Sequence, residues 1–249
     1  MTGSPLVVVH PDATTLADGV AARLLTRLLD IQSVRSPIHV VVTGGTLGIA
    51  SLAAVARNPL VSAIDWSAVH FWWGDERYVP AGDPDRNEGQ ARAALLDFLV
   101  SSHGLPPRNV HVAPCFRDTV GVEEAALAYG SDLNEFAPVG GSLPSFDVLM
   151  LGVGPDAHVA SLFPGHPGLS RTGITTGIED SPKPPPLRIT LTLDAINTAR
   201  EVWLIASGAS KADAVARALG SAPVDEAPAG HVHGTERTLW LVDAASLGE

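Results

Sequence analysis

The residues best suited to acid–base chemistry lie in the segment LMLGVGPDAHVASLFPGHP, residues 149–167. Its apolar run breaks at Gly152 and Gly154 and is followed by Asp156 and His158. An imidazole exchanges protons near neutral pH, and a carboxylate two residues away could orient it. A histidine buried in the core and hydrogen-bonded to a backbone carbonyl is the alternative, so this segment alone leaves both roles open.

A second candidate cluster follows the aromatic run HFWW, residues 70–73. Gly74 ends this run, and Asp75, Glu76 and Arg77 come directly after it. Three charged residues delivered together at a strand end could form part of a functional site. The alternative is a surface charge cluster closed by local ion pairs.

Two further segments have the composition of an anion site. In VVVTGGTLGIASL, the residues Gly44, Gly45 and Thr46 stand between an apolar run and a helical pattern. Backbone N–H groups at such a helix start can bind phosphate. In SGASKADAVARAL, Lys211 falls in the first turn of a predicted helix and could assist them. The alternatives are an ordinary strand–helix turn with Thr46 as N-cap and a solvated lysine.

Several common catalytic and cofactor patterns are absent from the sequence. G-x-S-x-G, H-E-x-x-H and the P-loop pattern do not occur. Gly152 and Gly154 match a dinucleotide fingerprint only loosely, because Pro155 fits poorly and no acidic strand-end residue follows at the usual distance. His231 and His233 have no acidic or thiol neighbour in sequence and are expected in a surface strand or loop. We therefore expect neither a metal nor any other cofactor.

Short β-branched runs, alternating with Ala- and Leu-rich runs, must position these clusters. Strands are predicted at residues 6–9, 38–43, 69–73, 109–113, 146–151, 187–193, 201–207 and 238–243. Apolar strands separated by helices predict an α/β fold, with a mostly parallel sheet and helices on both faces. Ligands bind at the carboxyl ends of the strands in such folds, and each candidate cluster follows a predicted strand.

No clear linker divides the chain, so a single α/β domain over residues 1–249 is predicted. The first helix is expected from about Ala13 to Ile31. The stretch from Gly165 to Pro186 is long and rich in glycine and proline, and we interpret it as a candidate lid or mobile rim.

The charge balance limits the partners. The chain carries 16 Lys and Arg against 27 Asp and Glu, a formal net charge of −11, and it has no Lys/Arg-rich run. This disfavours nucleic acid, and it means that a local cluster of donors must hold any anionic substrate. Cys115 is the only cysteine, which excludes an internal disulfide. The start of the sequence has a short apolar run and no basic segment, so we expect a cytoplasmic protein with no membrane partner.

Taken together and in order, the motifs resemble those of the 6-phosphogluconolactonase family, the sugar-lactone hydrolases of the pentose phosphate pathway. The resemblance covers most of the chain and rests on VVTGGTLG, FWWGDERYVP, RNEGQARAALL, LMLGVGPDAHVASLFPGHP, RITLTLDAIN and VWLIASGASKADAV. It implies a Rossmann-like α/β fold similar to that of the glucosamine-6-phosphate deaminases. Two positions depart from the family pattern: Ala157 replaces the usual glycine, and Arg86 stands where serine is common. Alanine at 157 would be strained if the position requires a positive φ.

The resemblance also implies a mechanism. The substrate would be a small molecule, 6-phospho-D-glucono-1,5-lactone, opened by an activated water without a metal or covalent nucleophile. His158 would act as general base and then as general acid, with Asp156 or Asp75 orienting it or the water. The residues expected to bind the phosphate are Gly44, Gly45, Thr46, Arg77, Arg188 and Lys211. A monomer is expected.

Two other functions are compatible with the same motifs. An aldose–ketose isomerase or deaminase acting on an amino-sugar phosphate could use Asp75 as its base. A sugar-phosphate sensor without turnover would keep the phosphate site alone, and Ala157 slightly favours it. The segments GDERYVP and PDAHVASLFPGHP favour the lactonase.

Overall fold

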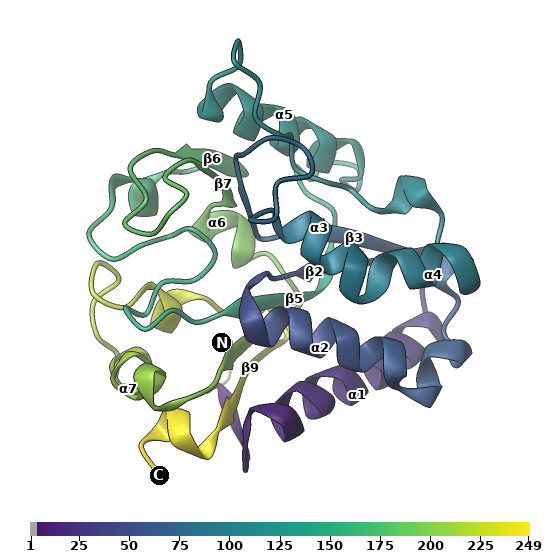
Figure 1. Ribbon diagram of the computed structural model, residues 1–249, viewed down its shortest axis with the longest axis horizontal. Helices are drawn as coiled ribbons and strands as arrows, with labels where there is room; N and C mark the ends of the chain where they lie inside the picture. The colour runs from purple at the N-terminus through teal and green to yellow at the C-terminus, as the bar shows by residue number, and fades with distance from the viewer. Residues whose placement is uncertain (1–3) are drawn as a thin grey trace.

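A six-stranded parallel sheet runs through the middle of the computed structural model, which describes residues 4–249 (Figure 1). The strand order is β1-β9-β8-β5-β2-β3, and every neighbouring pair is parallel. The strands are β1 (Leu6–His10), β2 (Ile38–Val42), β3 (Val69–Trp73), β5 (Phe146–Gly152), β8 (Glu201–Ala206) and β9 (Arg237–Asp243). Because all six are parallel, their carboxyl ends meet at one edge of the sheet, as predicted.

The apolar runs of these strands are buried on both faces. In β2, Val40 and Val42 pack into the core shared with α1 and α2, and Val41 packs into the core on the other face. All three have no exposed surface. Successive side chains point to opposite faces, so a strand covered on both sides must be apolar at every position rather than at alternate ones.

Helices cover both faces, as the sequence predicts. The helices α1 (Ala13–Gln32) and α2 (Gly45–Arg57) lie side by side on one face (Figure 1). The other helices are α3 (Asn87–Ala91), α4 (Asp97–Ser102), α5 (Val122–Glu135), α6 (Leu193–Ile196) and α7 (Ala212–Leu219). Within residues 4–249, no helix combines the length and the apolar character needed to cross a membrane.

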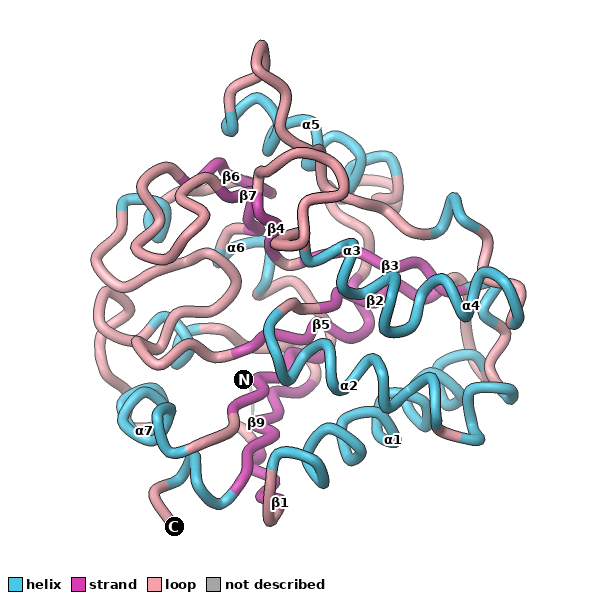
Figure 2. Tube along the Cα trace, viewed as in Figure 1, coloured by secondary structure: helices cyan, strands magenta, loops and turns pink. Residues whose placement is uncertain are grey.

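A second, antiparallel sheet of three strands lies beneath α5 (Figure 2). Its order is β4-β7-β6, with β4 (Asp75–Arg77), β7 (Arg188–Leu191) and β6 (Thr175–Ile178). Ile189 and Leu191 of β7 belong to the same core as Val41 of the main sheet. The small sheet therefore holds the segment that follows β3 against the main sheet.

Two expectations about local structure are wrong. Residues 187–193 give the short antiparallel β7 rather than a strand of the parallel sheet. Residues 109–113 form no strand, and Val110 makes only an isolated bridge to Phe71. The stretch 165–186 contains β6, which begins with the β-branched pair Thr175 and Thr176 and pairs with β7.

Candidate active site

A cavity of about 210 Å³ opens where β2, β3 and β5 end. It brings together most of the residues singled out in the sequence. They come from the turn after β2, from β4, from the segment after β5, and from the start of α7. Its lining comprises Thr43, Gly44, Gly45, Asp75, Arg77, Asn87, Gly152, Val153, Gly154, Pro155, His158, Ala160, Lys183, Arg188 and Lys211.

His158 reaches this cavity from a tight turn that follows β5. The turn is closed by hydrogen bonds from the Gly154 N–H to the His158 carbonyl, 2.9 Å, and from the Ala157 N–H to the Gly154 carbonyl, 3.0 Å. A Cβ at position 154 would lie 1.9 Å from His158 Nδ1, so only glycine leaves room for the imidazole. The His158 ring also packs against Phe163, with ring centroids 4.6 Å apart. The His158 side chain is 17% exposed, so its neighbours restrict the ring but leave it accessible from the cavity.

Asp156 is the hydrogen-bond partner of His158. Its Oδ1 contacts His158 Nδ1 and lies 3.1 Å from Lys183 Nζ. Burial raises the pKa of the Asp156 carboxyl, but the hydrogen bonds and charges of His158 and Lys183 outweigh this effect and hold the pKa well below its usual range. The group is therefore an anion at neutral pH and can only accept hydrogen bonds. An anionic acceptor at Nδ1 favours a proton on that nitrogen and leaves Nε2 free to act as a base.

The helix α2 presents its N-terminus to the cavity through Gly44 and Gly45. Gly45 has φ +78°, a conformation that favours glycine. A Cβ on Gly44 would lie 1.9 Å from Asn87 Oδ1, so glycine is required for this close approach. The N-terminus of a 13-residue helix carries partial positive charge and suits a phosphate. Thr46 lies instead in the adjoining groove of about 610 Å³ between α1 and α2.

Lys211 lines the same cavity. It precedes α7, and its Nζ donates a hydrogen bond to the Val153 carbonyl. Burial lowers the pKa of Lys211, the nearby ammonium of Lys183 lowers it further, and Asp156 opposes both effects. An ammonium that is partly desolvated and close to another cation gains most when a dianion binds between them.

Asp75 and its neighbours form the wall of the cavity that belongs to the small sheet. Asp75 Oδ2 accepts a hydrogen bond of 2.7 Å from Ser161 and lies 3.8 Å from Arg188 Nη1. Arg77 Nη1 donates to the Asp85 carbonyl at 2.6 Å. Arg188 is 5% exposed and is also engaged with backbone carbonyls of residues 183–185. Both guanidinium groups thus line the cavity while they also hold backbone in place.

Two residues that line the cavity, Asn87 and Lys183, were not identified from the sequence. Asn87 begins α3, and its Nδ2 donates to the Asp75 carbonyl at 2.9 Å. Lys183 belongs to the proline-rich loop before β7. Glu76, which the sequence did single out, lies behind the cavity: it is 1% exposed and accepts hydrogen bonds from the backbone N–H groups of Asn87 and Glu88 at 2.7 and 2.9 Å. Burial raises the pKa of Glu76, whereas Arg86 and these N–H donors oppose the rise.

Comparisons with known proteins place the chain in a family. The family model described as glucosamine-6-phosphate isomerases/6-phosphogluconolactonase matches residues 11–240. The chain belongs to this family of α/β proteins. A 6-phosphogluconolactonase of Streptomyces coelicolor is 50% identical over 254 residues, which cover 100% of this chain and 96% of that protein. A 6-phosphogluconolactonase of Mycobacterium tuberculosis is 43% identical over 243 residues, which cover 96% of both chains.

Solved structures agree on the fold. The structure of 6-phosphogluconolactonase from Trypanosoma brucei superimposes with a TM-score of 0.84 at 26% identity and covers 100% of this chain and 99% of that one. A monomeric glucosamine-6-phosphate deaminase shares the fold alone, with a TM-score of 0.77 at 17% identity over 98% of this chain and 99% of that one. The expected likeness to the deaminases is thus confirmed for the fold.

Proposed function

We propose that this chain hydrolyses 6-phospho-D-glucono-1,5-lactone to 6-phospho-D-gluconate, with His158 as general base and then general acid. Curated 6-phosphogluconolactonases that are 43–50% identical to the chain over nearly its full length support the activity. One structural observation supports the chemistry: an imidazole with an anionic partner and a helix N-terminus with a lysine line the same cavity.

The phosphate is the group by which the protein would bind and position the substrate. In the proposed complex it is held by the N–H groups at the start of α2 and by the ammonium of Lys211, with Arg77 and Arg188 as further cations. Thr46 would contribute from the adjoining groove. Holding a remote group in this way places the lactone carbon next to His158 and converts part of the binding free energy into positioning.

In the proposed reaction His158 carries one proton in two steps, from the attacking water to the leaving ring oxygen. His158 Nε2 removes a proton from water as the water oxygen attacks the lactone carbonyl carbon, and the Asp156 carboxylate stabilises the resulting imidazolium through Nδ1–H. The tetrahedral intermediate collapses by breaking the bond between C1 and the ring oxygen. His158 returns the proton to that oxygen, and the product is a hydroxy acid that ionises at neutral pH. Asp75 remains the alternative residue for orienting the water.

The test measures acid release from freshly prepared lactone in a pH-stat, corrected for spontaneous hydrolysis. We expect His158→Ala to lower kcat by about 10²–10⁴-fold, which is the usual contribution of general acid–base catalysis. We expect the control Lys211→Met chiefly to raise KM, because it removes phosphate binding in the ground state. A His158→Ala protein with near-normal kcat would exclude this mechanism. Release of ammonia from glucosamine-6-phosphate would assign the chain to the deaminase branch of the family.

A further inference from the structure

Lysine is rare in this chain, and both lysines are in one place. Of the 16 basic residues only Lys183 and Lys211 are lysines, and the others are arginines. Both line the cavity that contains His158. Lysine differs from arginine in presenting a compact point charge with three rotatable donors. Lys211 already has a place in the proposed phosphate site, whereas the mechanism so far gives Lys183 none.

The loop that carries Lys183, residues 181–187, is held by its own backbone and by Arg188. The Ser181 N–H donates to the Pro186 carbonyl at 3.0 Å, and the Ser181 hydroxyl donates to the Lys183 carbonyl at 2.9 Å. Arg188 donates to the carbonyls of Lys183, Pro184 and Pro185, each at 3.0 Å. These contacts fix the loop backbone, so the place from which the Lys183 side chain extends is fixed too.

The ammonium of Lys183 contacts both members of the Asp156–His158 pair. Its Nζ lies 3.1 Å from Asp156 Oδ1 and 3.1 Å from His158 Nδ1. An ammonium has no acceptor, and an ionised carboxylate has no donor. The arrangement is satisfied when both Lys183 and Nδ1–H donate to Asp156 Oδ1, and this leaves the lone pair of His158 on Nε2. A lysine that donated to Nδ1 instead would force the proton onto Nε2 and remove the base.

We propose that Lys183 is a positioning residue: by pairing with Asp156 it holds that carboxylate on the Nδ1–H of His158 and keeps Nε2 as the unprotonated atom. The inference rests on the proposed role of His158 and goes beyond it.

Other charges face His158 as well and must be kept constant in a test. Asp156 lies on its own turn, and Lys211 precedes α7. Asp75, Arg77 and Arg188 lie elsewhere on the wall of the same cavity. A change at Lys183 that leaves these groups in place reports on the lysine alone.

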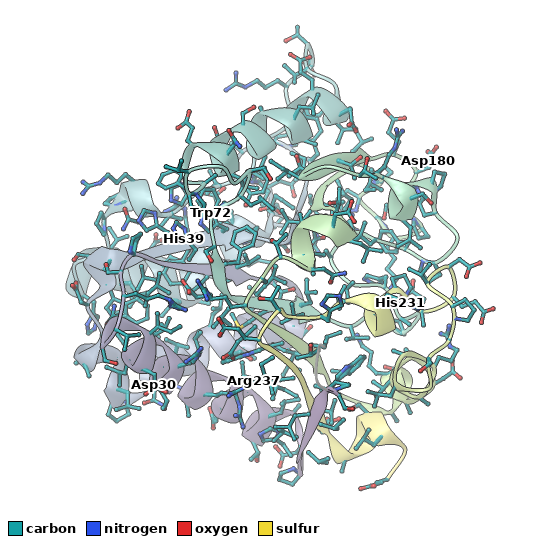
Figure 3. The ribbon with its side chains drawn as sticks, turned by 180° about the vertical axis from the view of Figure 1, so that it is seen from behind. Asp30, His39, Trp72, Asp180, His231 and Arg237 are labelled. Carbon is teal, nitrogen blue, oxygen red and sulfur yellow. The ribbon has the colours of Figure 1, made fainter. Side chains whose placement is uncertain are left out.

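The experiment compares kcat and KM of the wild type with those of Lys183→Met, Lys183→Arg and a control, Asp180→Asn. Asp180 is an exposed residue of the same segment with φ +55°, a conformation that asparagine tolerates (Figure 3). We expect Lys183→Met to lower kcat by about tenfold, the effect of one modest hydrogen bond. We also expect KM to change little, because Lys183 is not part of the proposed phosphate site. Lys183→Arg keeps the charge and should restore kcat, and Asp180→Asn should match the wild type.

A spectroscopic measurement follows the tautomer directly. In protein labelled with ¹⁵N-imidazole, the His158 signals are assigned by their absence from His158→Ala. We expect Nδ1–H in the wild type and a mixture of the two neutral tautomers in Lys183→Met at the same pH. Nε2–H as the main form in the wild type would overturn the proposal.

The outcomes separate this inference from the mechanism on which it rests. If His158→Ala keeps its activity, the mechanism fails, whatever Lys183 does. If His158→Ala is inactive while Lys183→Met keeps the wild-type kcat and the Nδ1–H tautomer, only the role of Lys183 fails. A Lys183→Met protein with a raised KM alone would make the lysine a phosphate ligand and would also overturn the proposal.

Discussion

His39 and His70 lie near the amino ends of β2 and β3, whereas His158 follows β5 at the carboxyl ends of the same sheet. The first two pack with His111 in a group of three imidazoles, which we call the histidine cluster. His158 has no histidine among its described ring contacts and pairs with a carboxylate. The two regions show how one residue type is given opposite tasks.

The histidine cluster is an aromatic stack. His111 lies on Trp72 with ring centroids 3.8 Å apart and planes 7° from parallel. His70 Nδ1 and His111 Nε2 are 2.9 Å apart, and the Trp72 indole N–H donates to His39 Nδ1 at 3.1 Å. Figure 3 shows His39 and Trp72 next to each other. Burial, assisted by repulsion between the imidazoles, lowers the pKa of His39 to about 3 and that of His111 to about 4. The cluster is therefore neutral and contributes packing.

The neighbours of His158 produce the opposite result. An anionic carboxylate stands at Nδ1, and the ring borders a cavity rather than other rings. An imidazolium formed during a reaction is stabilised there, whereas in the cluster it would be desolvated among other imidazoles. The difference lies in the charge and solvent access of the neighbours, which the types of residue near each histidine in the sequence only partly reveal.

The strongest test of this difference between His158 and the histidine cluster is to neutralise Asp156, the partner of His158. In Asp156→Asn the side chain keeps its shape but loses its charge. A hydrogen bond to a charged group contributes about 1.5–3 kcal/mol, so we expect kcat to fall by about 10–100-fold. The pH-stat assay measures this, with His111→Phe in the cluster as the control that keeps wild-type kcat. Equal activity of Asp156→Asn and wild type would shift the orienting role to Asp75.

Protonation of the histidine cluster at low pH should lower the free energy of unfolding rather than kcat. The pKa values of His39 and His111 in the fold lie below the value of about 6.5 expected when the chain is unfolded, so the unfolded chain binds more protons in between. The stability that these two neutral histidines contribute is therefore fully present above pH ~6.5 and is lost as the pH falls toward about 4. The expected loss is on the order of 1 kcal/mol per pH unit for each of the two histidines.

Urea unfolding between pH 7 and pH 5 measures this slope. The control is again His111→Phe, which keeps an aromatic ring against Trp72 but cannot titrate. Its free energy of unfolding should depend less steeply on pH than that of the wild type. Identical slopes in the two proteins would show that His111 does not contribute to acid sensitivity.

The sequence predicts the main sheet and the edge at which its polar residues collect, because both depend on local patterns. Apolar runs identify buried strands, and glycines mark the turns that carry Asp75 and His158. The small sheet was missed because it pairs Asp75–Arg77 with Arg188–Leu191, and pairing over such a distance leaves no local signal. The strand at 109–113 was predicted from β-branched residues alone, but tertiary pairing there is confined to one bridge.

The site itself was predictable in part. The clusters at the strand ends lie together in the structure. Thr46, however, lies in the adjoining groove, and Arg188 donates hydrogen bonds to carbonyls of the loop before β7. Asn87 begins α3 and Lys183 lies in the loop before β7, and the positions of both depend on the small sheet, so spacing could not place them. The rarity of lysine in the composition was the one available signal for Lys183.

The smallest expected effect concerns Ala157, which joins the two members of the Asp156–His158 pair. Its φ is +69°, so the strain anticipated for alanine at this position is present. The left-handed conformation costs about 1–2 kcal/mol, which Ala157→Gly would relieve. Against this, the buried methyl group contributes about 0.8 kcal/mol and glycine adds about 0.5–1 kcal/mol of unfolded-chain entropy. The terms nearly cancel, so the free energy of unfolding in urea should change by less than about 1 kcal/mol.

The same substitution tests whether alanine disturbs the base. His158 already contacts Asp156 with alanine at 157, so its orientation does not depend on a glycine there. We therefore expect kcat of Ala157→Gly to stay within about twofold of the wild type, because an unchanged hydrogen bond leaves the barrier unchanged. A tenfold rise in kcat would show that the imidazole is held away from its working position in this chain. It would also mean that His158 differs from the histidine cluster in backbone strain at Ala157 as well as in its neighbouring residues.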